Sequence, residues 1–251
     1  MTTPDTQPKG SPMRLILKLV LVGVIGFIGY QGYVWGERAW RIAHPEVNIL
    51  PLPDTHVGLD SPEGQRLLKT SKHRADFDIL NPRFEPQQYR SYCGVATGVI
   101  AVNALRKQPV VTQDDWFNDA GSEVRSGWDT FFGGMTLEEF SGLVKSHGLK
   151  AKFQHGGDFD LNALRAAVKA NMATPKDLLV INYSRKVLEQ KGWGHFSPVA
   201  GYHADSDRVL ILDVGAHKYR PSWVSLKTLW DAMNTPDSDS GKNRGYAVIR
   251  L

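Results

Sequence analysis

Residues 86–105 read PQQYRSYCGVATGVIAVNAL and contain Cys93, the only cysteine of this 251-residue chain. From Gly94 onward the residues are small or apolar, and the larger apolar side chains recur at helical spacing without an intervening proline. This pattern predicts a buried helix that begins next to Cys93. Because backbone amides at a helix N-terminus carry partial positive charge, they favour a thiolate and a lowered thiol pKa. Cys93 is therefore a candidate nucleophile, although a lone cysteine among apolar residues is more often a small core residue.

Composition and charge narrow the class of protein. A hydrophobic content of 41% and a charged content of 22% are ordinary for a globular domain. Basic residues exceed acidic ones by 30 to 26, but the two signs are interleaved, so nucleic-acid binding is not expected. One cysteine excludes an intrachain disulfide and a Cys-x-x-Cys metal site. If the chain is a thiol enzyme, Cys93 is its only candidate nucleophile.

The N-terminal part of the sequence predicts a membrane anchor. Residues 1–14 are polar, contain prolines and are expected to form a disordered cytoplasmic tail. Residues 15–36 are nearly all apolar, and about 20 such residues are needed to cross a bilayer. Aromatic residues follow where a cleaved signal peptide would have small ones, so we favour an uncleaved transmembrane helix: Tyr30, Tyr33, Trp35 and Trp40. Leading positive charge places the following domain outside the membrane, and for a bacterial chain this predicts a single-pass inner-membrane protein with a periplasmic domain.

After a linker at residues 37–49, residues 50–251 predict one α+β domain. Helical patterns come first and strand patterns afterward, which is typical of helices packed against an antiparallel sheet. The expected helices cover residues 62–70, 93–105, 112–119, 136–147, 161–170 and 226–233. The expected strands cover residues 178–184, 195–202, 209–214 and 246–251.

Two further residues are candidate partners for the cysteine. His195 lies in GWGHFSP and Asp213 in LILDVGA, on two strands that a tight turn would join as a hairpin. This places a carboxylate against the imidazole, where it would fix the ring and leave the second nitrogen to take the thiol proton. A cysteine at a helix N-terminus, followed by a histidine and an acid on strands, is the arrangement of papain-like cysteine enzymes. Taken singly, His195 is more often a core histidine, and Asp213 is more often a strand-end residue that caps backbone amides.

Three longer motifs carry a specific resemblance. They read QxxxxYCGxAxxxxxxNAL from Gln87, RxxLxQxGxGHFSPxxGYH from Arg185 and LDVxxxKYxPxWVxLxxLWxAM from Leu212. In this order they closely resemble phytochelatin synthase, the glutathione gamma-glutamylcysteinyltransferase family. The resemblance implies a papain-like fold with a helical N-terminal lobe and an antiparallel-sheet C-terminal lobe.

The resemblance also implies a mechanism. Cys93 would attack the cysteinyl-glycine bond of glutathione, expel glycine and hold a gamma-glutamylcysteinyl thioester. His195 would act as general base and acid with Asp213 orienting it, and Gln87 would join the Cys93 amide in an oxyanion hole.

Further residues are implied in substrate binding. The gamma-glutamyl end would contact Arg185, Asp237 and Arg244, because a free amino-acid terminus needs a cation for its carboxylate and an acid for its ammonium. Lys218 and Tyr219 align with the second-substrate region. Plant members read DVARFKY where this chain reads DVGAHKY, so Ala216 replaces an arginine there, which weakens the case for long peptide products.

The sequence thus predicts a membrane-anchored thiol enzyme acting on glutathione or its S-conjugates, with water or a second glutathione as acceptor. No built-in cofactor is expected, since cadmium or zinc would enter as the glutathione thiolate. A general papain-like peptidase is one alternative. A non-catalytic, membrane-tethered binder of thiols or metals is another, in which His203, His217 and Asp213 would ligate an ion. Whether the chain forms a homodimer is left open.

Overall fold

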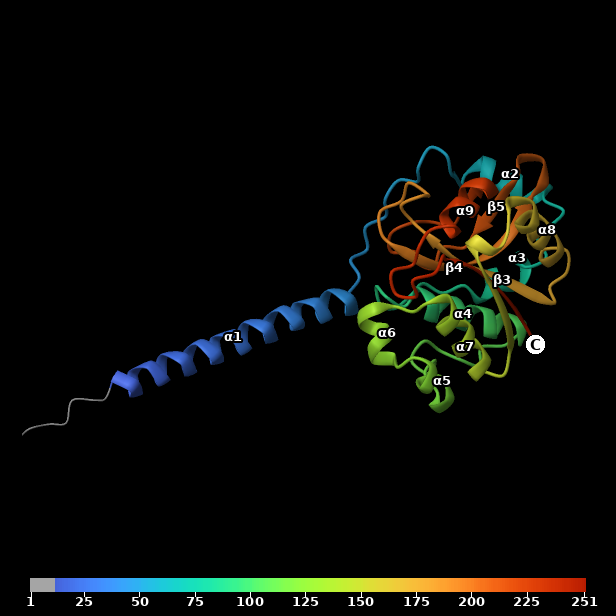
Figure 1. The fold of residues 1–251 in the computed structure, drawn as a ribbon. Helices are drawn as coiled ribbons and strands as arrows, with labels where there is room; N and C mark the ends of the chain where they lie inside the picture. Colours follow the sequence, from blue (N-terminus) through green and yellow to red (C-terminus); the bar gives the residue numbers. More distant parts are fainter. Residues whose placement is uncertain (1–11) are drawn as a thin grey trace, which may run out of the picture. The chain divides into compact units, whose positions relative to one another are not determined.

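The computed structural model describes residues 12–251, so most of the tail expected at residues 1–14 lies outside the described residues. The chain forms two compact units that divide between Arg41 and Ile42. One helix makes up the described part of the first unit, and the second unit contains the sheet and the remaining helices (Figure 1).

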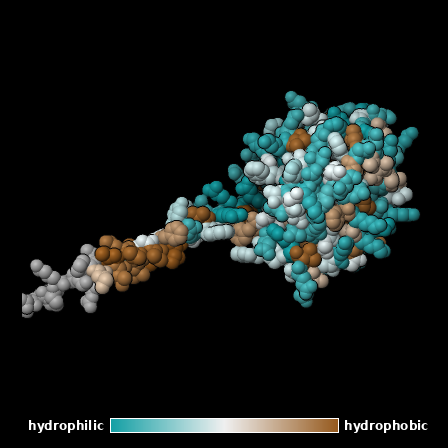
Figure 2. Space-filling view, in the orientation of Figure 1, coloured by the Kyte–Doolittle hydropathy of each residue, from teal (hydrophilic) through white to brown (hydrophobic). Residues whose placement is uncertain are grey.

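The described part of the first unit belongs to helix α1, Pro12–Ala43, whose last two residues fall in the second unit. Its segment Ile16–Ala43 is long and apolar enough to span a membrane, by length and composition. Figure 2 shows apolar side chains gathered along this helix, in contrast to the mostly hydrophilic surface of the second unit. The helix continues through residues 37–43, which the sequence analysis assigned to the linker. It ends there because Pro45 follows, and the residue before a proline disfavours helical geometry.

The second unit is built on a 7-stranded antiparallel sheet in the order β1-β6-β5-β4-β3-β7-β2. The strands have the following bounds: β1 Val57–Gly58, β2 Lys150–His155, β3 Asp177–Ser184, β4 Gly194–His203, β5 Arg208–Ile211, β6 Ser222–Ser225 and β7 Gly245–Arg250. Helices precede most of the strands along the chain, so the α+β class predicted from the sequence is confirmed.

Helices cover both faces of the sheet, and each strand alternates its side chains between two cores. On one face, Leu178 and Val180 of β3 pack in a cluster with α2 Pro62–Thr70, α4 Cys93–Leu105 and α7 Leu137–Ser146. On the other face, Leu179 and Ile181 pack with α8 Leu161–Asn171 and α9 Leu226–Met233. The shorter helices are α3 Phe77–Leu80, α5 Asp119–Val124 and α6 Gly127–Gly133, with 3-10 turns at Asn81–Arg83, Gly156–Asp158 and Ala204–Ser206.

Helix α4 is the central element of the first core, and every residue from Gly94 to Leu105 is buried. Its glycines allow neighbours to approach closely. A Cβ on Gly94 would lie 2.6 Å from Met135 Sδ, and one on Gly98 would lie 2.3 Å from the Trp116 ring. The small residues of the quoted stretch therefore let α4 sit deep in the domain with Cys93 at its start.

Some elements differ from the sequence prediction. The helix predicted for residues 112–119 is wrong: Thr112 and Asp115 form a side-chain turn, with Thr112 Oγ1 donating to Asp115 Oδ2 at 2.7 Å. The buried Trp116 holds this segment on the core, and α5 begins only at Asp119. Strands β1, β2 and β6 and helices α3, α5 and α6 were not predicted. The strand predicted for residues 209–214 is shorter, because β5 ends at Ile211.

Candidate active site

Cys93 is the first residue of α4, where the sequence analysis placed it, and its thiol is half-buried. Helix α4 packs on strand β4. The backbone amides of Phe196 in β4 and of Gly94 in its own helix lie near the sulfur and favour a lower thiol pKa. Because Phe196 directly follows His195, this contact brings the thiol and the imidazole to the same end of β4.

His195 is the second residue of β4 and is held on two sides. Its Nε2 atom lies 2.8 Å from Asp213 Oδ1, and its ring meets the ring of Tyr183 edge-on, 5.6 Å between centroids. An ionised carboxylate accepts hydrogen bonds only, so Nε2 carries the proton in the neutral ring. Nδ1 is then the basic nitrogen, free to accept a proton from the thiol.

Asp213 reaches His195 from outside the sheet. The β4–β5 pairing, with Val199 opposite Ile211, shifts between Val199 and Gly201, and β5 ends before Asp213. The sequence predicted that the two residues would lie nearly opposite in a hairpin. Asp213 instead lies beyond the paired part of β5, and the predicted contact between carboxylate and imidazole is present. Asp213 Oδ1 also accepts from the Gly215 amide at 2.8 Å, a local turn that fixes the carboxylate beyond the strand end.

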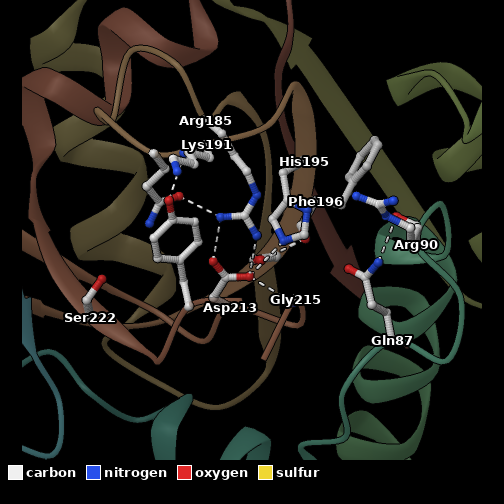
Figure 3. Close-up of polar contacts among 12 residues, drawn as sticks. Gln87, Arg90, Arg185, Lys191, His195, Phe196, Asp213, Gly215 and Ser222 are labelled. Atoms are coloured by element: carbon white, nitrogen blue, oxygen red, sulfur yellow. Dashed lines mark hydrogen bonds and ion pairs between the residues drawn. The ribbon is translucent and has the colours of Figure 1, made fainter. Parts of the chain in front are cut away.

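Arg185 has partners other than the substrate carboxylate expected from the sequence. Its guanidinium donates to both oxygens of Asp213, from Nη1 to Oδ2 at 2.8 Å and from Nη2 to Oδ1 at 2.7 Å (Figure 3). Nη1 also donates to Gln190 Oε1 at 2.6 Å. The side chain is only 5% exposed. Arg185 therefore neutralises the negative charge of the buried Asp213 carboxylate and orients that carboxylate. The sequence did not indicate this role. Gln190 helps to hold the Arg185 guanidinium in place.

These contacts set the protonation of the site. Burial, followed by the charge of Arg185, lowers the pKa of His195 to about 4, against the opposing effect of Asp213. Burial raises the pKa of Cys93, against the opposing effects of the Phe196 amide and Arg185. The lowered thiol pKa expected from the helix N-terminus is therefore wrong, because desolvation outweighs it. The resting pair consists of a neutral thiol and a neutral imidazole.

Gln87 is buried in the loop before α4. Its Nε2 atom donates to the carbonyl oxygens of Tyr89 and Arg90, both at 2.8 Å, and in Figure 3 it lies with Arg90 apart from the Arg185–Asp213–His195 group. Its Oε1 atom has no hydrogen-bond partner among the described residues. Donation to an oxyanion would require one of the Nε2 hydrogen bonds to be exchanged.

Arg244 adjoins the catalytic strand. A Cβ on Gly194 would lie 3.1 Å from Arg244 Nε and 3.2 Å from Nη2, so the guanidinium rests against the residue before His195. Its Nη1 atom donates to Thr235 Oγ1 at 3.0 Å. Its Nε is buried without a hydrogen-bond partner within residues 12–251. One edge of the guanidinium is thus held by the protein and the other is left for an acceptor.

With this geometry in place, comparison with known proteins gives the family. Residues 47–246 match the family model of phytochelatin synthase. The chain belongs to the phytochelatin synthase family. It is 33% identical over 208 residues to glutathione gamma-glutamylcysteinyltransferase 3 of Lotus japonicus, covering 80% of this chain and 43% of that protein. It is 31% identical over 206 residues to the Schizosaccharomyces pombe enzyme of that name, covering 79% of this chain and 50% of that protein.

The chain spans about half or less of the length of these relatives, 43% and 50% in the two cases given. Residues 47–246 of this chain, which match the family model, lie within the second unit, Ile42–Leu251. The resemblance expected from the three sequence motifs is therefore confirmed at the level of the family.

The remaining residues expected at a phytochelatin synthase site lie around Arg185 and Arg244. Tyr219 is buried below the Arg185 guanidinium, 5.2 Å from ring centroid to Cζ, and its hydroxyl accepts from the Lys191 amide at 2.7 Å. Lys218 is half-buried on the Gly192 side, and burial, followed by the charges of Arg185 and Arg90, lowers its pKa. Asp237 is half-buried in the same loop as Arg244 and accepts from the Asp239 amide at 3.1 Å.

The metal-binder alternative finds no support in the side-chain positions. His203 lies at the end of β4 opposite to His195, and its ring nitrogens contact Thr70 Oγ1 at 3.1 Å and Ser206 Oγ at 2.8 Å. It therefore cannot share an ion with Asp213. In the part of the chain that the structure describes, no group of three or more His, Cys, Asp or Glu side chains is placed to hold a metal.

Proposed function

We propose that this chain transfers the gamma-glutamylcysteine dipeptide from glutathione through a thioester on Cys93, with release of glycine. The observation that carries this proposal is the hydrogen bond of His195 Nε2 to Asp213, which leaves Nδ1 as the basic nitrogen on the strand that packs against the cysteine helix. Family membership supports the substrate, because the matched relatives are named for this transfer.

In the first half of the proposed reaction, Nδ1 of His195 takes the thiol proton as the sulfur attacks the carbonyl carbon of the cysteinyl-glycine bond. The backbone amide of Cys93 and the side chain of Gln87 would stabilise the oxyanion. His195 then returns the proton to the glycine nitrogen, the carbon–nitrogen bond breaks and the thioester remains.

In the second half, His195 removes a proton from the acceptor. The amine of a second glutathione gives a phytochelatin, and water gives free gamma-glutamylcysteine. In both cases the carbon–sulfur bond breaks and the sulfur regains its proton from the imidazolium. Lys218 and Tyr219 are proposed to lie on the acceptor side.

Recognition of the gamma-glutamyl end is proposed to rest on Arg244 and Asp237. The unpaired edge of the Arg244 guanidinium lies against Gly194, where it would bind the alpha-carboxylate, and Asp237 would bind the ammonium. Because Arg185 is committed to Asp213, we assign it to positioning of the acid. Cadmium or zinc is proposed to enter as the glutathione thiolate, as part of the substrate, and glutathione S-conjugates as alternative substrates.

The proposed setting follows from the fold. The start of α4 at Cys93, with the histidine on β4 and the acid after β5, supports a papain-like domain. Helix α1 is proposed to anchor this domain at the inner membrane with the second unit in the periplasm, since positive charge leads the apolar segment. A homodimer stays a prediction, which light scattering on the purified chain would check.

The test is incubation of the full-length chain in detergent with glutathione, with and without cadmium, followed by mass spectrometry. We expect glycine release and gamma-glutamylcysteine or its oligomers from the wild type, and neither product from Cys93→Ala. A peptide with an ordinary alpha-linked N-terminus serves as control, because a general papain-like peptidase would cleave it as readily as glutathione. Absence of glycine release from a folded wild-type chain would refute the proposal.

A further inference from the structure

We propose that His155 and Glu138 are positioning residues for glutathione binding, because together they fix the loop that carries Asp237 and Arg244. The inference rests on the proposed function for its substrate. Its structural part concerns residues 234–244, which we call the substrate loop.

The substrate loop is closed on itself by hydrogen bonds between its two arms. The Arg244 amide donates to the Thr235 carbonyl at 2.9 Å, and the Asp237 amide donates to the Lys242 carbonyl at 2.8 Å. Pro236 and Asn243 form an isolated antiparallel bridge. Because these bonds lie within the loop, they give it a shape but do not set its position on the domain.

Between its ends at α9 and β7, the loop is also held on the domain by the end of β2. The Gly156 amide donates to the Arg244 carbonyl and His155 Nδ1 contacts the Asn243 carbonyl, both at 2.6 Å. Gly156 allows this approach, since a Cβ there would lie 2.5 Å from the Met233 carbonyl oxygen. On its other side, the ring of His155 places Nε2 at 3.0 Å from Glu138 Oε1. His155 therefore joins the loop to helix α7.

Both ring nitrogens of His155 face acceptor groups. A carbonyl oxygen of the loop faces Nδ1 and a carboxylate of α7 faces Nε2. Although burial opposes it, Lys242 and His155 lower the pKa of Glu138, which keeps this carboxylate ionised. The groups around the ring are Glu138 from α7, Lys242 from the loop, 2.9 Å from the same Oε1 atom, and the apolar edge of Phe153. The ring thus links an acceptor on the loop with an acceptor on α7.

Helix α7 also reaches the nucleophile. Met135, one residue before the Thr136 cap of α7, packs on Gly94 next to Cys93. The start of α7 therefore contacts the cysteine helix through Met135 and the substrate loop through Glu138. A loop released from Glu138 would carry the Arg244 guanidinium away from Gly194, and with it the carboxylate site away from His195.

The experiment compares His155→Gln, Glu138→Gln and the double variant with the wild type, all as the full-length chain. We expect each single variant to raise KM for glutathione about tenfold with kcat changed less than about twofold, because the lost interaction acts on binding. The double variant should be no worse than either single one, since both remove the same link. Glu139→Gln is the matched control: Glu139 pairs with Arg125 at 2.9 Å in the same helical turn, and glutamine still completes the cap.

Hydrogen exchange of residues 234–244 without substrate provides a readout that does not depend on turnover. We expect faster exchange in His155→Gln and Glu138→Gln and wild-type exchange in Glu139→Gln. Unchanged exchange and unchanged KM in the first two variants would overturn the inference, as would an equal KM increase in Glu139→Gln. A wild type without glycine release would refute the proposed function alone, and the exchange data would still decide whether His155 and Glu138 fix the loop.

Discussion

Arg185 and Asp213 form a buried two-bond ion pair in which each carboxylate oxygen accepts from one guanidinium nitrogen, at 2.7 and 2.8 Å. The same Oδ1 atom accepts from His195 at 2.8 Å. The acid that orients the catalytic base is therefore shared with a permanent positive charge. This sharing favours the neutral imidazole, because Arg185 offsets the charge that would otherwise stabilise an imidazolium.

Substitution of Arg185 should therefore move the titration of His195. In Arg185→Met, we expect the pKa of His195 to rise from about 4, since the guanidinium that lowers it is lost. The acid limb of the pH–rate profile for glycine release should shift to higher pH, with kcat reduced by about a hundredfold as Asp213 loses its orientation.

Because a buried carboxylate left without its partner can cost about 3–5 kcal/mol, Arg185→Lys serves as the companion variant. It retains the charge but not the paired geometry. For Arg185→Lys we expect a reduced kcat, with the acid limb of the pH–rate profile at the same pH as in the wild type. An acid limb in folded Arg185→Met that coincides with the wild-type limb would contradict the assigned role.

The protonation of Cys93 can be read from alkylation rates. Burial raises the pKa of this thiol, so the thiolate is scarce at neutral pH. We expect the rate of iodoacetamide labelling to keep rising about tenfold per pH unit through pH 7 to 9, because only the thiolate reacts. Cys93→Ala is the blank, since no other cysteine is present. A rate that is already level below pH 7 would instead indicate a preformed thiolate–imidazolium pair.

Asp76 should make the stability of the domain depend on pH. It is fully buried at the start of α3, neither carboxylate oxygen has a hydrogen-bond partner among the described residues, and burial, with a contribution from Asp177, raises its pKa to about 8. The folded state therefore keeps a proton that the unfolded chain loses near pH 4, so stability falls as pH rises between these values. The slope for one proton is about 1.4 kcal/mol per pH unit.

Denaturant unfolding at pH 5, 7 and 9 tests this dependence. The free energy of unfolding of Asp76→Asn, relative to that of the wild type, should increase with pH and become constant above pH 8. Asp78→Asn, an exposed neighbour, should follow the wild-type curve. If the free energies of unfolding of wild type and Asp76→Asn change with pH in parallel, Asp76 does not titrate in this way.

Gly98 should be required for the packing of α4. A methyl group there would lie 2.3 Å from the Trp116 ring, which is fully buried. We expect Gly98→Ala to lower the free energy of unfolding by about 1–3 kcal/mol, the usual cost of overpacking. Trp116→Phe in the same chain should recover part of the lost free energy of unfolding, because the smaller ring leaves space for the methyl group introduced by Gly98→Ala. If Gly98→Ala unfolds at the wild-type denaturant concentration, the close contact does not limit packing.

Sequence reasoning named the candidate catalytic residues because each sits at a position with a local signal, and the structure brings His195 and Asp213 together. Cys93 precedes an apolar helical run, and His195 and Asp213 flank a hairpin turn. It did not find the role of Arg185, because a charged residue at a strand end usually faces solvent and its burial depends on Asp213, 28 positions away. Strand β2 was missed because its exposed and buried residues alternate weakly, and it pairs only with the distant β7. Residues 112–119 were wrongly predicted to be helical because their apolar residues have helical spacing. The tertiary packing of Trp116 instead decides the conformation of this segment.

A thiol that stays protonated is a poor target for peroxide and a poor ligand for soft metal ions, because both react with the thiolate. Cys93 is half-buried and burial raises its pKa, so the resting chain keeps its nucleophile out of both reactions. The same burial that makes the thiol depend on a neighbouring base for activation thus lowers its reactivity toward oxidants and metal ions.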